Sequence, residues 1–64
     1  MIKINGEEHN ANGKTIANYL IESNYDMKCV AVEINGEILP KAQYEDTVIK
    51  DGDIIEIVSF VGGG

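Results

Sequence analysis

Residues 51–64 read DGDIIEIVSFVGGG, and this stretch decides the fold. Asp51-Gly52-Asp53 is typical of a tight turn, and the apolar run after it predicts a strand over Ile54–Val61. The sequence then closes on Gly62, Gly63 and Gly64. Because glycine has no Cβ, a glycine arm can lie extended and enter a channel too narrow for other residues. We therefore expect a flexible arm that carries a free α-carboxylate on Gly64 from the end of a strand.

The predicted last strand has two different faces. Its alternation places Ile55, Ile57 and Ser59 on one face and Ile54, Glu56, Val58 and Phe60 on the other. If the first set packs against a helix, Val58 and Phe60 stay exposed next to the arm. We interpret them, together with Val61 and with the acidic Glu56 at the rim, as a docking patch for partner proteins. The alternative is that Phe60 is a core residue.

Two hairpins are predicted upstream, each with an Asn-Gly turn. Both central residues of a type I′ turn need positive φ, which asparagine and glycine tolerate. The hairpins are, in chain order, Ile2–Ile4 with Glu7–Asn10 around Asn5-Gly6, and Val30–Ile34 with Glu37–Leu39 around Asn35-Gly36. Pro40 is expected to end the second hairpin, as it does in short or edge strands.

One helix is predicted between the hairpins. Thr15 is its expected N-cap, since a hydroxyl there can accept a hydrogen bond from an amide of the first turn. The helix is expected to end near Ser23-Asn24. Its apolar stripe should face the core and comprises Ile16, Ala17, Tyr19, Leu20 and Ile21.

These elements predict an α+β domain in which one helix crosses one face of a small mixed sheet. If the first and last strands are parallel neighbours, their link must be a long crossover, and the whole middle of the chain supplies it. A chain of 64 residues, 44% of them hydrophobic, can build one domain with a single core. We assign residues 1–61 to this domain and residues 62–64 to the arm.

Charge and length argue against several classes of function. Eleven acidic residues against five basic ones give a formal net charge of −6, which would repel a nucleic-acid partner. A domain of this size leaves little room for a walled active-site cleft, which favours a carrier, subunit or binding module over an enzyme. No stretch approaches a membrane-spanning length, and one cysteine cannot form an intramolecular disulfide. We expect a cytoplasmic protein without a membrane partner.

The other reactive side chains are interpreted as structural. Cys29 is expected to open the strand beside Val30 as a packed thiol. His9 has no second histidine or cysteine at ligand spacing, which argues against a zinc site. The Asp51-Gly52-Asp53 segment lacks the twelve-residue pattern of a calcium loop. We therefore expect no bound metal.

Four segments in this order resemble the ThiS family of sulfur carriers, whose fold is the ubiquitin-like β-grasp. They are IKING at residues 2–6, VEINGEILP at 32–40, DGDIIEI at 51–57 and FVGGG at 60–64. The resemblance covers essentially the whole chain. The family's terminal Gly-Gly falls on Gly63 and Gly64, and Gly62 lengthens the arm.

The resemblance implies a carrier function at Gly64 in thiamine biosynthesis. A ThiF-like adenylating enzyme would use ATP to convert the Gly64 carboxylate to an acyl-adenylate, and sulfur from a cysteine desulfurase would then replace AMP. The resulting thiocarboxylate would donate its sulfur to a ThiG-like thiazole synthase. The carrier itself would bind no cofactor and supply no acid, base or metal.

Two other functions stay open from the sequence. The MoaD-like small subunit of molybdopterin synthase resembles this chain in fold, terminal Gly-Gly and thiocarboxylate chemistry, although those subunits are usually longer. A non-catalytic ubiquitin-like interaction module is the other alternative. Its glycines would form an isopeptide bond to lysine or be only a tail.

Overall fold

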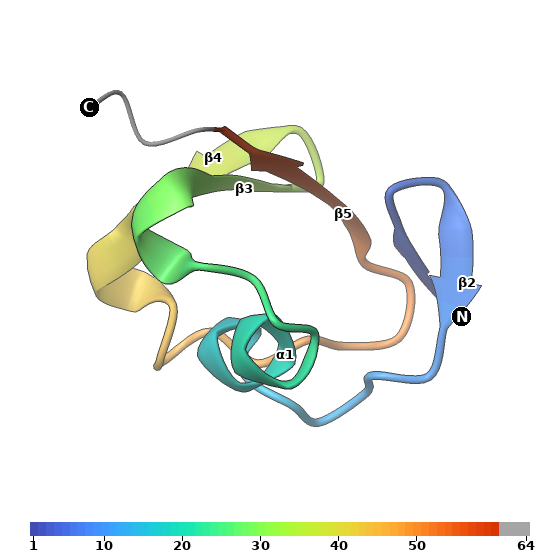
Figure 1. The fold of residues 1–64 in the computed structure, drawn as a ribbon. Coiled ribbons are helices and arrows are strands. Elements are labelled where there is room, and N and C mark those ends of the chain that lie inside the picture. Colours follow the sequence, from blue (N-terminus) through green and yellow to red (C-terminus); the bar gives the residue numbers. More distant parts are fainter. Residues whose placement is uncertain (61–64) are drawn as a thin grey trace.

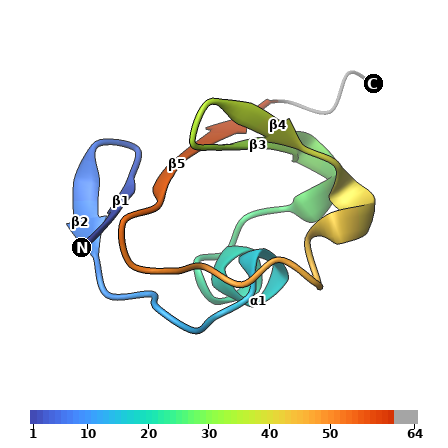
Figure 2. The same ribbon diagram turned by 180° about the vertical axis from the view of Figure 1, so that it is seen from behind.

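A five-stranded sheet curves around one α-helix in the computed structural model, which describes residues 1–60 (Figures 1 and 2). The sheet order is β2-β1-β5-β3-β4. The predicted α+β arrangement of one helix on a small mixed sheet is confirmed. The strands are β1 (Ile2–Ile4), β2 (Glu7–His9), β3 (Val30–Ile34), β4 (Glu37–Leu39) and β5 (Ile54–Ser59). The helix is α1 (Ile16–Glu22), and two 3₁₀ turns are η1 (Met27–Cys29) and η2 (Lys41–Gln43).

β5 is the middle strand of the sheet. It runs parallel to β1, with Lys3 opposite Ile54. It runs antiparallel to β3 and pairs with every residue of that strand. The parallel pairing needs a long crossover, and the chain between β1 and β5 supplies it as predicted. β5 ends at Ser59 rather than at Val61, which lies outside the described residues. A second correction concerns Cys29, which ends η1 instead of opening β3.

The first Asn-Gly turn holds β5 by its side chain as well as by its backbone. Asn5 and Gly6 have φ values of 52° and 82°, as a type I′ turn requires. Beyond the backbone pairs of β1 with β5, Asn5 Oδ1 accepts a hydrogen bond from the Ile57 N–H at 2.8 Å. Asn5 Nδ2 donates to the Ile57 carbonyl at 3.2 Å. The side-chain amide thus replaces a peptide group and extends the ladder between the two strands.

The second Asn-Gly turn also binds β5 through its asparagine side chain, from the other side of the strand. Asn35 has a φ of 53°, and its Oδ1 accepts a hydrogen bond from the Ile54 N–H at 2.9 Å. Asn35 Nδ2 donates to Asp53 Oδ1 at 3.1 Å, and the other oxygen of Asp53 accepts from the Lys50 N–H at 2.9 Å. These bonds tie the turn before β5 to the β3–β4 hairpin. The two asparagines therefore fix β5 from both sides.

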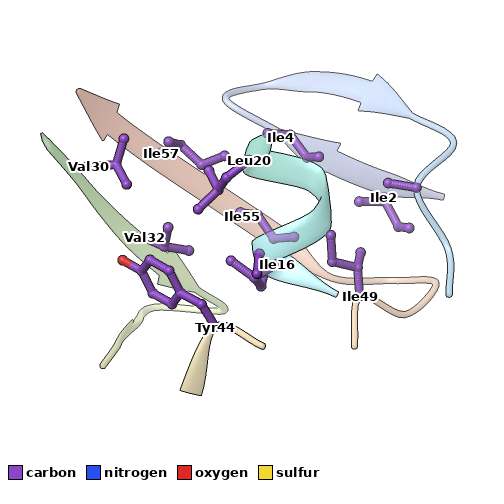
Figure 3. Packing of buried hydrophobic residues seen from close by; sticks show 12 residues of the cluster. Ile2, Ile4, Ile16, Leu20, Val30, Val32, Tyr44, Ile49, Ile55 and Ile57 are labelled. Atoms are coloured by element: carbon purple, nitrogen blue, oxygen red, sulfur yellow. The ribbon is translucent and has the colours of Figure 1, made fainter. Parts of the chain in front are cut away.

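Helix α1 lies across the inner face of the sheet. The Thr15 hydroxyl accepts a hydrogen bond from the Asn18 N–H at 3.1 Å, so the predicted N-cap is confirmed. Ile21, predicted to widen the apolar stripe, is instead 60% exposed. At 3.6 residues per turn, a position five residues after Ile16 points away from the sheet. Figure 3 shows the helix side chains packing onto those of β1, β3 and β5. The buried hydrophobic cluster comprises Ile2, Ile4, Ala11, Ile16, Ala17, Leu20, Val30, Val32, Tyr44, Ile49, Ile55 and Ile57.

We predict that Asn35→Ala lowers the free energy of unfolding by about 2 kcal/mol or more. The substitution forces alanine into positive φ and removes the partner of the Ile54 N–H and of Asp53. Asn35→Gly keeps the backbone geometry, so it should lose only the side-chain bonds and cost less. Denaturant unfolding of the variants measures these losses.

Asn12→Ala is the matched control. Asn12 also precedes a glycine, but its own φ is not positive. A loss of stability at Asn12 as large as that at Asn35 would contradict the role given to the asparagine clamp.

Candidate functional site

The sheet face turned away from α1 is exposed, and we call it the open face. Its apolar side chains are well exposed: Ile38 is 77% and Val58 is 60% exposed. Figures 1 and 2 show β3, β4 and β5 side by side, with α1 on the other side of the sheet. Contiguous apolar exposure of this kind on a small protein indicates an interaction surface. The open face carries Ala31 and Glu33 of β3, Ile38 of β4, and Ile54, Glu56 and Val58 of β5.

Phe60 follows β5 directly and is 48% exposed, so it is not a core residue. Its N–H donates a hydrogen bond to the Cys29 carbonyl at 2.8 Å, which continues the backbone pairing past the end of the strand. The predicted exposure of Val58 and Phe60 is confirmed, while their role in docking stays a prediction. Four other predicted site residues lie outside the described residues, namely Val61, Gly62, Gly63 and Gly64.

Glu56 lies at the centre of the open face and not at its rim, contrary to the sequence-based expectation. It stands between Ile54 and Val58 on the middle strand. Directly across the strand pair is Glu33 of β3, and Ile38 of β4 is next in the same row. Sequence reasoning missed Glu33 as a site residue. The alternation within β3 already places it on the outer face, but its partner follows only from the register between two distant strands.

Two like charges face each other in this row. The neighbouring Glu56 side chain raises the pKa of Glu33 above its ordinary value, first through a hydrogen bond between the two side chains. Partial burial and charge repulsion act in the same direction. The ion pairs within residues 1–60 lie elsewhere and join Met1 to Asp51, His9 to Glu7, and Lys14 to Glu22.

A hollow of about 150 Å³ opens beside these two carboxylates. Sites for small-molecule substrates usually measure roughly 300–1,000 Å³. The hollow is therefore better suited to a single side chain of another protein than to a substrate. Its lining comprises Ala31, Val32, Glu33, Ile38, Glu56 and Val58.

His9 and Cys29 lie apart from the open face. The His9 ring meets Tyr19 edge-on, with the centroids 6.0 Å apart, and its Nε2 lies 3.7 Å from a Glu7 carboxylate oxygen. Cys29 is half-buried and has a free thiol. Within residues 1–60, no three His, Cys, Asp or Glu side chains lie together as a metal site. In the same part of the chain, no helix is both long and apolar enough to cross a membrane.

Comparison with known proteins adds a family to this geometry. The sequence profile of the ThiS family matches residues 2–64. The sulfur carrier protein ThiS of Thermus thermophilus is 36% identical over 64 residues, which cover the whole of both chains. A thiazole synthase of Paramagnetospirillum magneticum is 48% identical over 62 residues. These residues cover 95% of this chain, which spans only about a fifth of that longer protein, or 19% of its length.

The fold also has a solved counterpart. The crystal structure of the thiamine biosynthesis protein ThiS from Geobacter metallireducens superposes with a TM-score of 0.76 at 31% sequence identity. The match covers 98% of this chain and 97% of that chain. The predicted ubiquitin-like β-grasp fold is thereby confirmed.

We predict that Glu33 contributes more stability in acid than at neutral pH. Because its pKa is raised on folding, its contribution is full below the ordinary glutamate value of roughly 4.3 and is lost as pH rises through the raised pKa. The N-terminal amino group lowers the pKa of Asp51. The contribution of Asp51 to stability is therefore lost only at lower pH. Thermal melting followed from roughly pH 4 to pH 7 therefore includes the loss of the Glu33 contribution.

The informative quantity is the difference between the wild-type chain and Glu33→Gln. The variant should melt higher at pH 7, and the gap should narrow as the pH falls. Glu45→Gln removes the same charge from an exposed site after η2 and serves as the control. An equal or lower melting temperature for Glu33→Gln at pH 7 would contradict the repulsion.

Proposed function

This chain belongs to the ThiS family, and we propose that it carries sulfur for thiazole formation in thiamine biosynthesis as a thiocarboxylate on Gly64. The observation that carries this proposal is the family match itself. It extends over residues 2–64, so it includes the terminal glycines as well as the folded part. In this role the chain is a carrier protein and not an enzyme.

The chemistry takes place on the α-carboxylate of Gly64. A carboxylate is a poor acyl electrophile, and transfer of AMP from ATP makes its oxygen part of a good leaving group while pyrophosphate is released. A sulfur nucleophile then attacks the acyl carbon and expels AMP. If the donor is a persulfide, a thiol must cleave the resulting acyl disulfide to release the thiocarboxylate. The thiocarboxylate stores sulfur as a nucleophile, and the folded domain supplies recognition.

Three enzymes act on the carrier in this scheme. A ThiF-like adenylating enzyme uses ATP, a cysteine desulfurase or another donor supplies sulfur, and a ThiG-like thiazole synthase accepts it. Two relatives named thiazole synthase support the last partner, because each contains a stretch similar to this chain within a longer protein. We place these steps in the cytoplasm, where thiols stay reduced. The carrier needs no cofactor of its own.

The thiamine role is better supported than the two alternatives. The matching profile is that of the ThiS family, and the names of the relatives concern sulfur carriage and thiazole synthesis. The two alternatives, a molybdopterin synthase subunit and a non-catalytic interaction module, are supported only by the fold and by the glycines at the end of the sequence. Sulfur on Gly64, in place of an isopeptide bond to lysine, would further separate a carrier from an interaction module.

We predict that deleting Gly64, or adding residues after it, abolishes adenylation. Deletion shortens the arm by one residue and misplaces the reacting carboxylate, and an error of about 1 Å in such geometry can cost about 100-fold in rate. The melting temperature should not change, because the buried cluster is built from residues between Ile2 and Ile57. Pyrophosphate release by the adenylating enzyme with ATP measures the effect.

Cys29→Ser is the control for this test. It leaves Gly64 intact, so the variant should still accept AMP and sulfur. Full activity of the Gly64-deleted chain, or loss of sulfur transfer in a normally folded Cys29→Ser variant, would contradict the proposal.

We also predict that Phe60→Ala weakens binding to the adenylating enzyme by about 1–3 kcal/mol, the range of a hot-spot truncation. Phe60 is exposed next to the arm, so its truncation should leave the melting temperature nearly unchanged. Ile21→Ala is the matched control, because Ile21 is also an exposed apolar residue but lies on the helix. Calorimetric titration measures the binding free energy, and a melting curve on the same samples shows whether each variant is folded. Unaltered binding by a folded Phe60→Ala variant would remove Phe60 from the docking surface.

A further inference from the structure

The centre of the open face carries a charge arrangement that does not stabilise an isolated domain. Glu33 and Glu56 are cross-strand partners, and the Cβ atoms of such a pair stand roughly 5 Å apart. Like charges directly opposite each other destabilise a sheet. The neighbours of the pair on this face are apolar and exposed, namely Ile38, Ile54 and Val58.

No cation within residues 1–60 compensates this pair. Lys3 shares the open face, since β1 places it opposite Ile54, but it is not within ion-pair distance of either carboxylate. Glu8 of β2 stands opposite Lys3 and adds another negative charge to the same face. The whole chain has a formal net charge of −6. A partner that brings a positive charge to this point would complement the face.

We propose that the hollow between β3, β4 and β5 receives one arginine side chain of the adenylating enzyme, whose guanidinium bridges the carboxylates of Glu33 and Glu56. The inference rests on the proposed function, because it requires the chain to dock on that enzyme. Docking there would bring the enzyme onto the hollow and onto the exposed Val58 and Phe60 at the carboxyl end of β5.

Arginine fits this hollow better than lysine does. Its planar guanidinium presents five N–H donors in a fixed fork, which allows it to bond two carboxylates at once. It is also more weakly hydrated than an ammonium group, so a partly apolar site excludes it less. Its methylene groups would pack against Ile38 and Val58, the apolar walls of the hollow.

A bridging arginine would remove a repulsion that the free domain carries. Replacing either glutamate by glutamine should therefore stabilise the free domain and weaken the complex. The pKa of Glu33 is raised first by its hydrogen bond with Glu56, which agrees with two carboxylates held close together. A purely structural role predicts a loss of stability instead, and a general charge effect predicts the same weakening for any acidic residue. The opposite signs of the two effects distinguish the proposal from both.

The first experiment measures KM and kcat for pyrophosphate release by the adenylating enzyme. The substrates are the wild-type chain, Glu33→Gln, Glu56→Gln, the double variant and the control Glu45→Gln. We expect KM to rise about tenfold for each single variant at the pair, as the loss of a charge-assisted hydrogen bond implies, with the effect on KM rather than kcat. Glu45→Gln should stay within about twofold of wild type, as expected for an exposed charge outside the interface.

The second experiment identifies the group that enters the hollow. Phenylglyoxal modifies accessible arginines, and peptide mass mapping of the adenylating enzyme shows which arginines the bound carrier protects. We expect one arginine that the wild-type chain and Glu45→Gln protect and that the double variant does not protect at the same concentration.

The outcomes separate this inference from the function on which it rests. If the enzyme does not adenylate the wild-type chain, the proposed function fails. If the wild-type chain is adenylated but KM is unchanged at Glu33 and Glu56, or rises equally for Glu45→Gln, the inference alone is overturned. Protection that does not depend on the two glutamates overturns it as well.

Discussion

The side-chain clamp on β5 is the constraint on which the rest of this structure depends. β5 is the middle strand, and it contacts β1 over only a short parallel stretch before β1 ends. Asn5 continues the pairing on that side through Ile57, and Asn35 closes the other side at Ile54. The same strand supplies core side chains inward and the open face outward. A shift of β5 by one residue would exchange the two sets, because strand side chains alternate with a period of two.

The open face is therefore built by the same strand that leads toward Gly64. Its exposed apolar residues and its glutamate pair lower the stability that the domain could otherwise reach, since exposed apolar groups and opposed like charges stabilise nothing in isolation. Proteins commonly retain such costs where a surface binds a partner. In the proposed function, several enzymes would recognise the carrier, and this surface would distinguish it better than its glycines alone. Recognition would then belong to the folded residues and the chemistry to Gly64.

Local patterns in the sequence predicted most of the fold and only part of the site. Alternation, the two Asn-Gly turns and the Thr15 cap are short-range signals, and the structure confirms them. Ile21 was misplaced because a helix of two turns buries a narrower stripe than the spacing suggested. Glu56 was assigned to a rim, and Glu33 was missed, because their meeting depends on the register between β3 and β5. Register depends on contacts between distant segments, which a reading of local periodicity does not contain.

The most direct test of the account is to locate the transferred sulfur by tandem mass spectrometry. The chain is incubated with the adenylating enzyme, ATP, a cysteine desulfurase and excess cysteine, whose thiol releases the thiocarboxylate from the acyl disulfide. The intact protein is then fragmented in the mass spectrometer. The account predicts a gain of about 16 Da, the exchange of one acyl oxygen for sulfur, on the fragment that contains only Gly64. A gain of about 32 Da on the fragment containing Cys29, which is the addition of a sulfur atom to a thiol, would contradict it. Absence of any gain in a reaction that releases pyrophosphate would contradict it equally.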